Sequence, residues 1–458
     1  MLRTSGQTGF LAACLAKLPD DLQFRTAVPA NREIYLSTPA DWSMFRLANC
    51  GVYRPLPASV RKTSPQGARK DSKTPVVLLL GPDLSAVSGV STHLNLLFAS
   101  SLAQQFSLRH FKVGREGREE NFVARMLRFL ASPFMLAKEI VTARVDIVHL
   151  NTSIDPRAYW RDVVYMLVAR LCATRVVYQI HGGDLPEAFC GNHRLLRTIL
   201  RASLSLSDAI VVLARCELEA YRAFIPGADI RVFPNAIDYA PYATLDRRRH
   251  DRQAPLRLVY IGRLARDKGL FDALEGVRRV CLQGGKVRFL IAGSGPDEAD
   301  LRQCVKKMAL SSEVSFARPV FGDAKIALLA EADVLLFPTF HREGLPYALL
   351  ECMAAGIPAI TTRVGAIPDV MADGVHGLFV LPGDVDGIAR AIVRLAGNPS
   401  QLAQMGVACR ERIKSHYTIQ RLSDHFSRLY SEIIAGTHAG DTRVSDPEYG
   451  LPHPDRHP

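Results

Sequence analysis

The stretch Glu343-Gly-Leu-Pro-Tyr-Ala-Leu-Leu-Glu351 has the pattern of a junction between a strand, a loop and a helix. An apolar run, residues 334–337, precedes it, and residues 348–354 continue it as a helical segment. Pro346 suits the first helical position, because its φ angle fits a helix and its missing N–H is not needed there. Glu343 then lies on the loop, and Glu351 lies more than one turn into the helix, roughly 7–8 Å further along the axis.

Two carboxylates in this arrangement could hold a long polar ligand at two points while its anionic middle faces the positive helix N-terminus. The alternative is an ordinary capping region with two solvated glutamates, because helix N-termini favour acidic residues in any case. The spacing alone does not decide between these two interpretations.

Apolar strand-like runs alternate with helical stretches on both sides of this junction. The first set of predicted strands comprises residues 76–80, 108–112, 146–151, 175–180, 209–213 and 230–233. The second set comprises residues 256–261, 287–292, 314–316, 334–337, 359–362 and 377–381. This alternation predicts an α/β fold with two doubly wound parallel sheets, each covered by helices on both faces. Ligands bind beyond the carboxyl ends of such strands, so the loops at Gly89, Asn151, His181 and Asn235 are candidate binding segments.

Changes in composition divide the chain into five segments. An arginine-rich linker separates the two sets of strands. The predicted segments are an N-terminal extension (1–72), two Rossmann-like domains (73–245 and 246–416), a helix (417–435) and a tail (436–458). We expect the extension to be poorly ordered, and its role as a regulatory arm, an anchor or an unused upstream start stays open. The tail is rich in Pro, His, Asp and Gly and is predicted to be disordered.

The run from Glu343 to Asp384, EGLPYALLECMAAGIPAITTRVGAIPDVMADGVHGLFVLPGD, resembles the signature region of retaining GT-B glycosyltransferases of family 4, the glycosyl transferases group 1. The mark of that family is a glutamate, seven intervening residues and a second glutamate. The resemblance implies the GT-B fold, in which two doubly wound Rossmann-like domains face one another across a cleft. The first domain is then the acceptor side, the second binds the nucleotide sugar, and residues 417–435 match the helix that returns to the first domain.

The same resemblance implies roles for single residues of the junction. Glu343 would be a catalytic contact of the donor sugar, Glu351 would bind the donor ribose, and Gly344 and Leu345 would belong to the donor loop. The resemblance thus assigns the two glutamates to opposite ends of the donor, whereas a glycosidase acid and nucleophile must flank one scissile bond. A front-face displacement, in which the leaving phosphate oxygen takes the acceptor proton, is the expected mechanism.

A second motif, Gly262-Arg-Leu-Ala-Arg-Asp-Lys-Gly269, directly follows a predicted strand. Fixed cations can stabilise the developing negative charge of a nucleoside diphosphate leaving group without a metal. Arg263 offers a rigid fork of donors, and Lys268 offers a compact point charge. The octet is similar to the family's diphosphate-binding loop, which implies this role for Arg263 and Lys268. Arg266 has no such match and is expected to face solvent.

The turn Gly293-Ser-Gly295-Pro296 ends a predicted strand and precedes a helix, as in dinucleotide-binding proteins. Glu298 stands where the third glycine of that fingerprint belongs, which argues against a nicotinamide enzyme. The resemblance instead places Gly293 and Gly295 in the donor loop near the nucleotide.

Two residues of the first predicted domain are also site candidates. A lone histidine is more often structural than catalytic, but the family carries a His-Gly pair near the transferred sugar, which implies a catalytic sugar contact for His181. Gly89 occupies the loop where backbone must approach the diphosphate closely, a role that glycine fills easily. The family often has two glycines there, and Ser88 replaces one of them in this sequence.

Asp384-Val385-Asp386 spells the DxD motif that binds a metal in another glycosyltransferase fold. It precedes an apolar helix, residues 388–395, so a helix cap is the simpler interpretation. The resemblance agrees, because family members generally need no metal held by protein carboxylates. We therefore expect no metal and no cofactor, with the nucleotide sugar acting as a substrate.

Composition limits the location and the partners. The net charge is +12, but the basic residues are dispersed without a recognised nucleic-acid motif, which argues against nucleic acid. An anionic membrane surface, phosphorylated substrates or simple solvation would each account for the charge. Nine scattered cysteines without a CxxC pair favour reduced thiols. We expect a cytoplasmic protein without a spanning segment, and contact with the inner face of the plasma membrane stays open.

One predicted helix carries an apolar stripe that bears on membrane contact. Phe122, Met126, Phe129 and Leu130 fall at i, i+4, i+7 and i+8, with Arg125 and Arg128 beside them. Such a stripe either packs into a core or lies weakly and reversibly on a membrane.

The sequence therefore predicts a retaining hexosyltransferase that moves a sugar from a nucleoside diphosphate sugar to a hydroxyl of a saccharide or lipid-linked acceptor. Polysaccharide or glycolipid biosynthesis is the expected context. The alternatives are a sugar-nucleotide epimerase of the same fold and a non-catalytic, membrane-associated subunit that binds nucleotide sugars.

Overall fold

The first parallel sheet contains six strands in the order β2-β1-β3-β4-β5-β6. Its strands are β1 (Val76–Gly81), β2 (Ser107–Lys112), β3 (Ile147–Ile154), β4 (Arg175–Gly183), β5 (Ala209–Val212) and β6 (Ile230–Val232). Alternate residues of β1 point to opposite faces, so Leu78 and Leu80 join one buried cluster and Val77 and Leu79 join another. Helices cover both faces, which is why β1 is buried along its whole length.

The structure is a computed structural model that describes residues 74–114, 121–246, 253–342 and 344–436, without the side chains of residues 122–124 and 157. The predictions for residues 1–72, for the tail beyond residue 436 and for the position of Glu343 therefore concern residues outside the described part of the chain.

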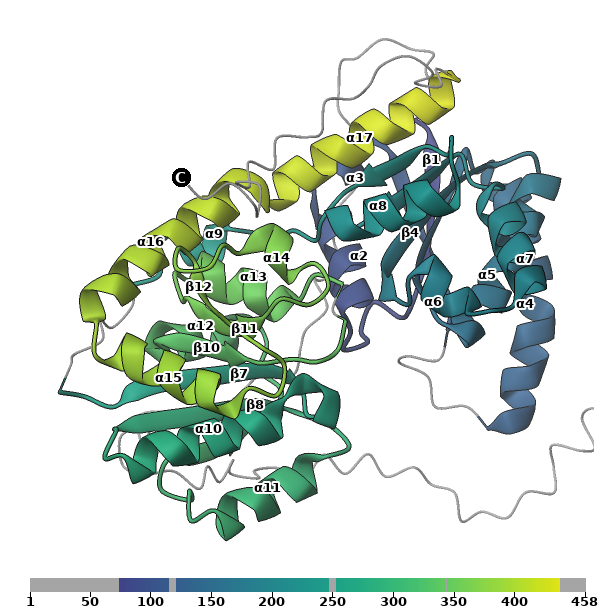
Figure 1. The fold of residues 1–458 in the computed structure, drawn as a ribbon. Coiled ribbons are helices and arrows are strands. Elements are labelled where there is room, and N and C mark those ends of the chain that lie inside the picture. The colour runs from purple at the N-terminus through teal and green to yellow at the C-terminus, as the bar shows by residue number, and fades with distance from the viewer. Residues whose placement is uncertain (1–73, 115–120, 247–252, 343, 437–458) are drawn as a thin grey trace, which may run out of the picture. The chain divides into compact units, whose positions relative to one another are not determined.

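Helices from distant parts of the sequence cover the first sheet. They are α2 (Gly89–Ala99), α3 (Leu102–Gln105), α4 (Phe122–Ala143), α5 (Pro156–Leu171), α6 (Pro186–Cys190), α7 (Arg194–Leu204) and α8 (Arg215–Phe224). The short helix α9 (Ala240–Ala243) instead joins the core of the second sheet through Tyr242. Helices α4 to α8 contribute to the core on one face. Helices α2 and α3 contribute to the core on the other face, together with the C-terminal helix α17 (Ile419–Ala435), which lies along them in Figure 1.

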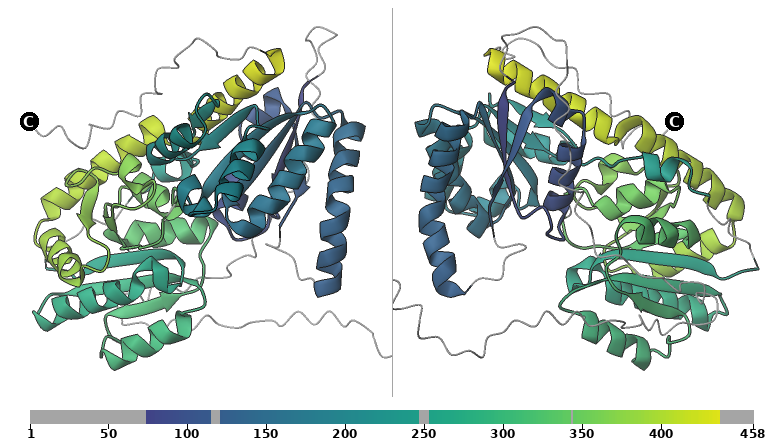
Figure 2. Two further views of the ribbon diagram at one scale, coloured as in Figure 1. Left: turned by 45° about the vertical axis from the view of Figure 1, so that its right-hand side comes forward. Right: turned by 180° about the vertical axis from the view of Figure 1, so that it is seen from behind.

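The second sheet is also parallel and has the order β12-β11-β10-β7-β8-β9. Its strands are β7 (Leu256–Arg263), β8 (Val287–Ser294), β9 (Val314–Ala317), β10 (Val334–Phe337), β11 (Ala359–Thr362) and β12 (Gly377–Val380). Its helices are α10 (Leu270–Leu282), α11 (Glu298–Lys307), α12 (Gly322–Glu331), α13 (Tyr347–Ala354), α14 (Ile367–Val370), α15 (Val385–Ala396) and α16 (Pro399–His416). Figure 2 shows helices on both faces of each sheet, as expected for two doubly wound units.

All twelve predicted strands are present within a few residues of their predicted bounds, and the predicted fold class is confirmed. Three local predictions are wrong. His181 lies within β4, not after it, because the strand continues to Gly183 beside β3. Pro346 caps α13 in an extended conformation, so the helix begins at Tyr347. Gly89, predicted to lie in a loop, is the first residue of α2, because Ser88 caps that helix.

No helix within the described residues is both long enough and apolar enough to cross a bilayer. The predicted domain boundaries stay predictions.

Candidate active site

The loop between β10 and α13 connects the predicted site residues. Its beginning is fixed to the basic motif, residues 262–269. The Asp267 carbonyl of that motif accepts hydrogen bonds from the backbone N–H groups of Phe340 at 2.9 Å and His341 at 3.1 Å. Gly269 adopts a left-handed conformation, and a Cβ there would lie 1.9 Å from the Pro338 carbonyl oxygen. Only glycine permits this close approach. The basic motif and the loop are therefore one packed unit.

The basic side chains of this motif differ in their surroundings. Arg263 is the last residue of β7, and its exposed guanidinium forms no ion pair within the described part of the chain. Lys268 is partly buried in a single 3₁₀ turn, Arg266–Lys268. The Arg266 guanidinium lies over the Phe271 ring at 4.5 Å, a cation–π contact that gives it a structural use. Arg263 therefore presents its donors to solvent, as an anion-binding residue must before its ligand arrives.

The two glycines of the predicted donor turn pack against the backbone of the same motif. A Cβ on Gly293 would lie 1.9 Å from the Gly262 carbonyl oxygen, and one on Gly295 would lie 2.1 Å from the Leu264 carbonyl oxygen. Both positions exclude larger residues for a packing reason alone. Their contribution is to hold the basic motif in place.

His181 lies near the end of β4, and its side chain is partly buried. Its Nε2 lies 3.0 Å from Oδ1 of Asn151 on β3, while the Asn151 amide nitrogen donates to the His149 carbonyl at 3.4 Å. This orientation of the amide makes Nε2 the protonated nitrogen and leaves Nδ1 as an acceptor. Burial, with smaller contributions from His93 and His149, lowers the pKa of His181 well below its ordinary value. The imidazole is therefore neutral at pH 7, and its Nδ1 has no hydrogen-bond partner among the described residues.

The far part of the loop touches the first sheet beside His181. A Cβ on Gly344 would lie 2.6 Å from the His181 carbonyl oxygen, and one on Gly182 would lie 3.3 Å from the Gly344 nitrogen. The Asn235 side chain donates to the Leu345 carbonyl at 2.8 Å. These contacts bring the His181-Gly182 pair and the donor-loop residues Gly344 and Leu345 together.

Gly89 lies close to the start of α13. The nearest atoms to a Cβ at Gly89 are ring carbons of Tyr347, at 3.8 and 3.9 Å, which is ordinary van der Waals contact. Ser88 caps α2 by accepting a hydrogen bond from the Ser91 N–H, so its replacement of a glycine is compatible with the helix start. The protein itself has room for a side chain at Gly89.

Glu351, one turn after Tyr347, forms an ion pair that sequence reasoning missed. Its carboxylate oxygens accept hydrogen bonds from Nζ of Lys325 on α12, at 2.8 and 3.0 Å, and both side chains are mostly buried. Burial, and to a lesser extent this carboxylate, raises the pKa of Tyr347 well above its ordinary value. No local pattern marks Lys325, because its role depends on how α12 packs beside α13.

The structure thus gathers Gly89, His181, Lys268, Gly344 and Glu351 around the β10–α13 loop. Glu343 lies outside the described residues, but both of its neighbours in sequence are part of that loop. The convergence comes from elements of both sheets.

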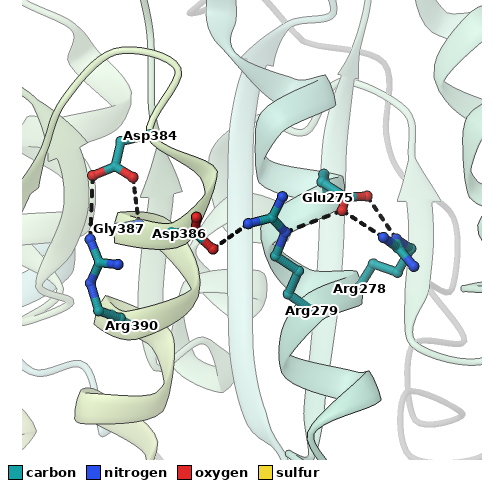
Figure 3. A network of polar contacts seen from close by, with 7 residues as sticks. All are labelled: Glu275, Arg278, Arg279, Asp384, Asp386, Gly387 and Arg390. Atoms are coloured by element: carbon teal, nitrogen blue, oxygen red, sulfur yellow. Dashed lines mark hydrogen bonds and ion pairs between the residues drawn. The ribbon is translucent and has the colours of Figure 1, made fainter.

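The DxD motif has a structural use away from this loop. Asp384 caps α15 by accepting a hydrogen bond from the Gly387 N–H at 2.8 Å, and it lies 3.6 Å from the Arg390 guanidinium. Asp386 pairs with Arg279 of α10, which also contacts Glu275 (Figure 3). The predicted helix cap is confirmed. Among the described residues no group of three His, Cys, Asp or Glu side chains is arranged to hold a metal, and metal independence stays a prediction.

Comparisons with known proteins agree for both halves of the chain. Residues 98–240 match the family model for Glycosyltransferase Family 4, and residues 255–398 match that for Glycosyl transferases group 1. N-acetyl-alpha-D-glucosaminyl L-malate synthase of Bacillus anthracis is 24% identical over 67% of this chain and 79% of its own length. Glycogen synthase of Mycobacterium tuberculosis is 28% identical over 56% of this chain, and the match spans only 59% of that relative.

Solved structures agree on the fold. Sucrose-phosphate synthase of Thermosynechococcus elongatus superposes with a TM-score of 0.63 at 17% identity, covering 79% of this chain and all of the other. Anabaena HepE in complex with UDP superposes with a TM-score of 0.58 at 14% identity, covering 78% of this chain and all of the other. With matching models over both halves and this fold, the chain belongs to the group 1 glycosyltransferases of GT-B architecture.

Proposed function

We propose that the protein is a retaining glycosyltransferase that moves a sugar from a nucleoside diphosphate sugar to a hydroxyl of a saccharide or lipid-linked acceptor. The observation that carries this proposal is the convergence of the basic motif, the His-Gly pair and Glu351 on the β10–α13 loop. A uridine nucleotide is the first donor to test, because Anabaena HepE was solved with UDP and with UDP-glucose.

In this proposal each group acts on one part of the donor. Arg263 and Lys268 hold the diphosphate and stabilise the charge that develops as the bond between the sugar anomeric carbon and phosphate oxygen breaks. The acceptor oxygen forms its bond to the same carbon on the same face, and its proton passes to the leaving phosphate oxygen. Retention of anomeric configuration follows from this front-face geometry.

The remaining groups position the donor. Glu351, held by Lys325, accepts hydrogen bonds from the ribose hydroxyls at one end. Glu343 contacts the sugar at the other end, and neutral His181 accepts a hydrogen bond from a sugar hydroxyl at Nδ1. Because fixed cations neutralise the diphosphate, transfer is expected to continue when divalent metals are chelated.

A panel of nucleotide sugars tests this proposal. A donor that binds only the folded protein raises the apparent melting temperature. With that donor and an acceptor mixture, nucleoside diphosphate should be released in step with glycosylated product, and NMR of the product should show the anomeric configuration of the donor. Conversion of the donor without an acceptor would identify an epimerase. Binding without turnover would identify a non-catalytic subunit, and an inverted product would overturn the retaining mechanism.

A further inference from the structure

The outward face of α5 is apolar along its length. After its first turn, the exposed side chains of this helix are Trp160, Val164, Leu167 and Leu171, at i, i+4, i+7 and i+11. They are between 37% and 86% exposed. A helix on the surface of a globular protein normally carries polar residues on this side. Packing among the described residues therefore does not account for this face.

Helix α4 repeats this feature. Leu127, Leu130, Phe134 and Val141 lie on its outward side and are between 61% and 78% exposed. Met126 and Phe129 of the predicted stripe are also exposed, and the apolar surface continues beyond that stripe because the helix runs on to Ala143. The predicted segment was therefore only the first part of a longer exposed face.

The two helices present these faces on the same side of the first sheet. Leu136 and Ile140 of α4 join the same buried core as Tyr165 of α5. The Tyr165 hydroxyl also donates to Ser132 of α4 at 2.9 Å. Because both inner sides meet one core, both outer sides face away from it, and Figures 1 and 2 show α4 and α5 together on that side.

The charges around these faces are strongly biased. Helices α4, α5 and α7, which share that core, carry nine basic and two acidic residues. Both acids are paired with arginines, since Glu139 pairs with Arg109 at 2.9 Å and Asp162 pairs with Arg161 at 2.7 Å. Two further arginines pair with acids of neighbouring segments, Arg170 with Asp208 and Arg197 with Glu187, so the excess of positive charge is smaller than the residue count but keeps its sign. An anionic partner is favoured, and a second copy of the same face is disfavoured because it would bring like charges together.

We propose that α4 and α5 dock the protein on a bilayer that contains anionic lipids. Apolar side chains bordered by basic residues, with a tryptophan near the headgroup level, are typical of helices that lie in the membrane interface. The exposed apolar side chains insert among the acyl chains, and exposed basic side chains of these helices, such as Lys138, contact the lipid phosphates. This attachment is independent of the transfer reaction, so it can fail while the proposed function stands.

Vesicle co-sedimentation of the full chain tests the proposal. Vesicles of phosphatidylcholine with roughly one-third phosphatidylglycerol should pellet the protein, and vesicles of phosphatidylcholine alone should pellet much less of it. The triple variant Leu130→Ser, Phe134→Ser, Leu171→Ser should lower the bound fraction by roughly fivefold or more. The matched control is Leu282→Ser with Val407→Ser, two equally exposed apolar residues on helices of the second half, and it should bind as the original chain does.

Trp160 provides a second readout, since Trp42 is the one other tryptophan in the sequence. In a Trp42→Phe background, the emission of Trp160 should shift to the blue when anionic vesicles are added. Absence of both pelleting and shift would overturn the proposal, as would equal loss of binding in the control variant. A dimer in sedimentation analysis that the triple variant dissociates would assign the face to a second copy instead.

Discussion

At the scale of single residues, the hydrogen bond between Asn151 and His181 fixes the tautomer of the histidine, and burial keeps the ring neutral. Asn151→Asp would place a carboxylate 3.0 Å from Nε2 and raise the low pKa of His181, because an opposite charge favours the imidazolium. Protonated Nδ1 can no longer accept a hydrogen bond. We expect the acidic limb of the rate–pH profile to move to higher pH. Asn151→Leu, which removes the bond without adding charge, should lower the rate without moving that limb, and identical profiles in all three proteins would refute this assignment.

Gly89 and Gly344 are glycines for different reasons, which gives a matched pair of variants. A Cβ at Gly89 meets nothing closer than 3.8 Å, so Gly89→Ala should keep the melting temperature and raise the donor KM by roughly tenfold, because the methyl group occupies space the diphosphate needs. Gly344→Ala should lower the melting temperature, since its Cβ would lie 2.6 Å from the His181 carbonyl oxygen. An unchanged KM in Gly89→Ala would remove the predicted diphosphate contact.

Lys325 is the residue-scale feature that was not predictable. Lys325→Met leaves the Glu351 carboxylate without the ammonium group that orients it, and charge-assisted hydrogen bonds contribute about 1.5–3 kcal/mol. We expect the donor KM to rise by roughly tenfold to a hundredfold, as measured by steady-state kinetics, with kcat less affected. Lys325→Arg should recover part of the loss. A KM equal to that of the original chain would show that Glu351 does not need this partner.

At the scale of elements, the DxD motif is predicted to act on stability alone. Asp384→Ala removes the cap of α15 and should lower the free energy of unfolding by about 1 kcal/mol in a denaturant titration. The transfer rate should stay the same with and without a metal chelator, because the pair lies away from the β10–α13 loop. A metal-dependent loss of activity in this variant would contradict the structural assignment.

The elements were largely predictable because each leaves a local pattern. Buried parallel strands are continuous apolar runs bounded by turns, so twelve of them could be located without coordinates. The ends of elements were less certain, since hydrogen bonds to a neighbouring strand extend β4 past His181. Pairs between elements, such as Lys325 with Glu351 and Asn151 with His181, depend on tertiary packing and leave no signal in the sequence. The exposure of α4 was equally hidden, because an apolar stripe looks the same whether it faces a core or solvent.

At the scale of the whole molecule, the C-terminal helix ties its stability to buried histidines. His149 of β3 faces α17, with its Nδ1 2.6 Å from the Tyr430 hydroxyl. Burial lowers the pKa of both His93 and His149 to about 3. The unfolded chain therefore binds more protons than the folded chain between about pH 3 and pH 6.5, and stability falls as the pH falls through that range.

This linkage can be measured by denaturant unfolding at several pH values. Each of the two histidines should contribute up to about 1.4 kcal/mol of lost stability per pH unit below pH 6.5. His149→Gln, which keeps a polar group near Tyr430 but does not titrate, should show a slope that is shallower by that amount. A variant with the same pH slope as the original chain would mean that His149 is not held neutral.

The most direct test of the donor site combines transfer rates and stability for Lys268→Ala and Glu343→Ala. With a donor identified from the nucleotide-sugar panel, we predict that each substitution lowers kcat/KM by roughly a thousandfold, while the melting temperature stays close to that of the original chain. Such a result would require both side chains to contact one bound donor. Near-normal transfer by either variant, in a folded protein, would contradict the site on the β10–α13 loop.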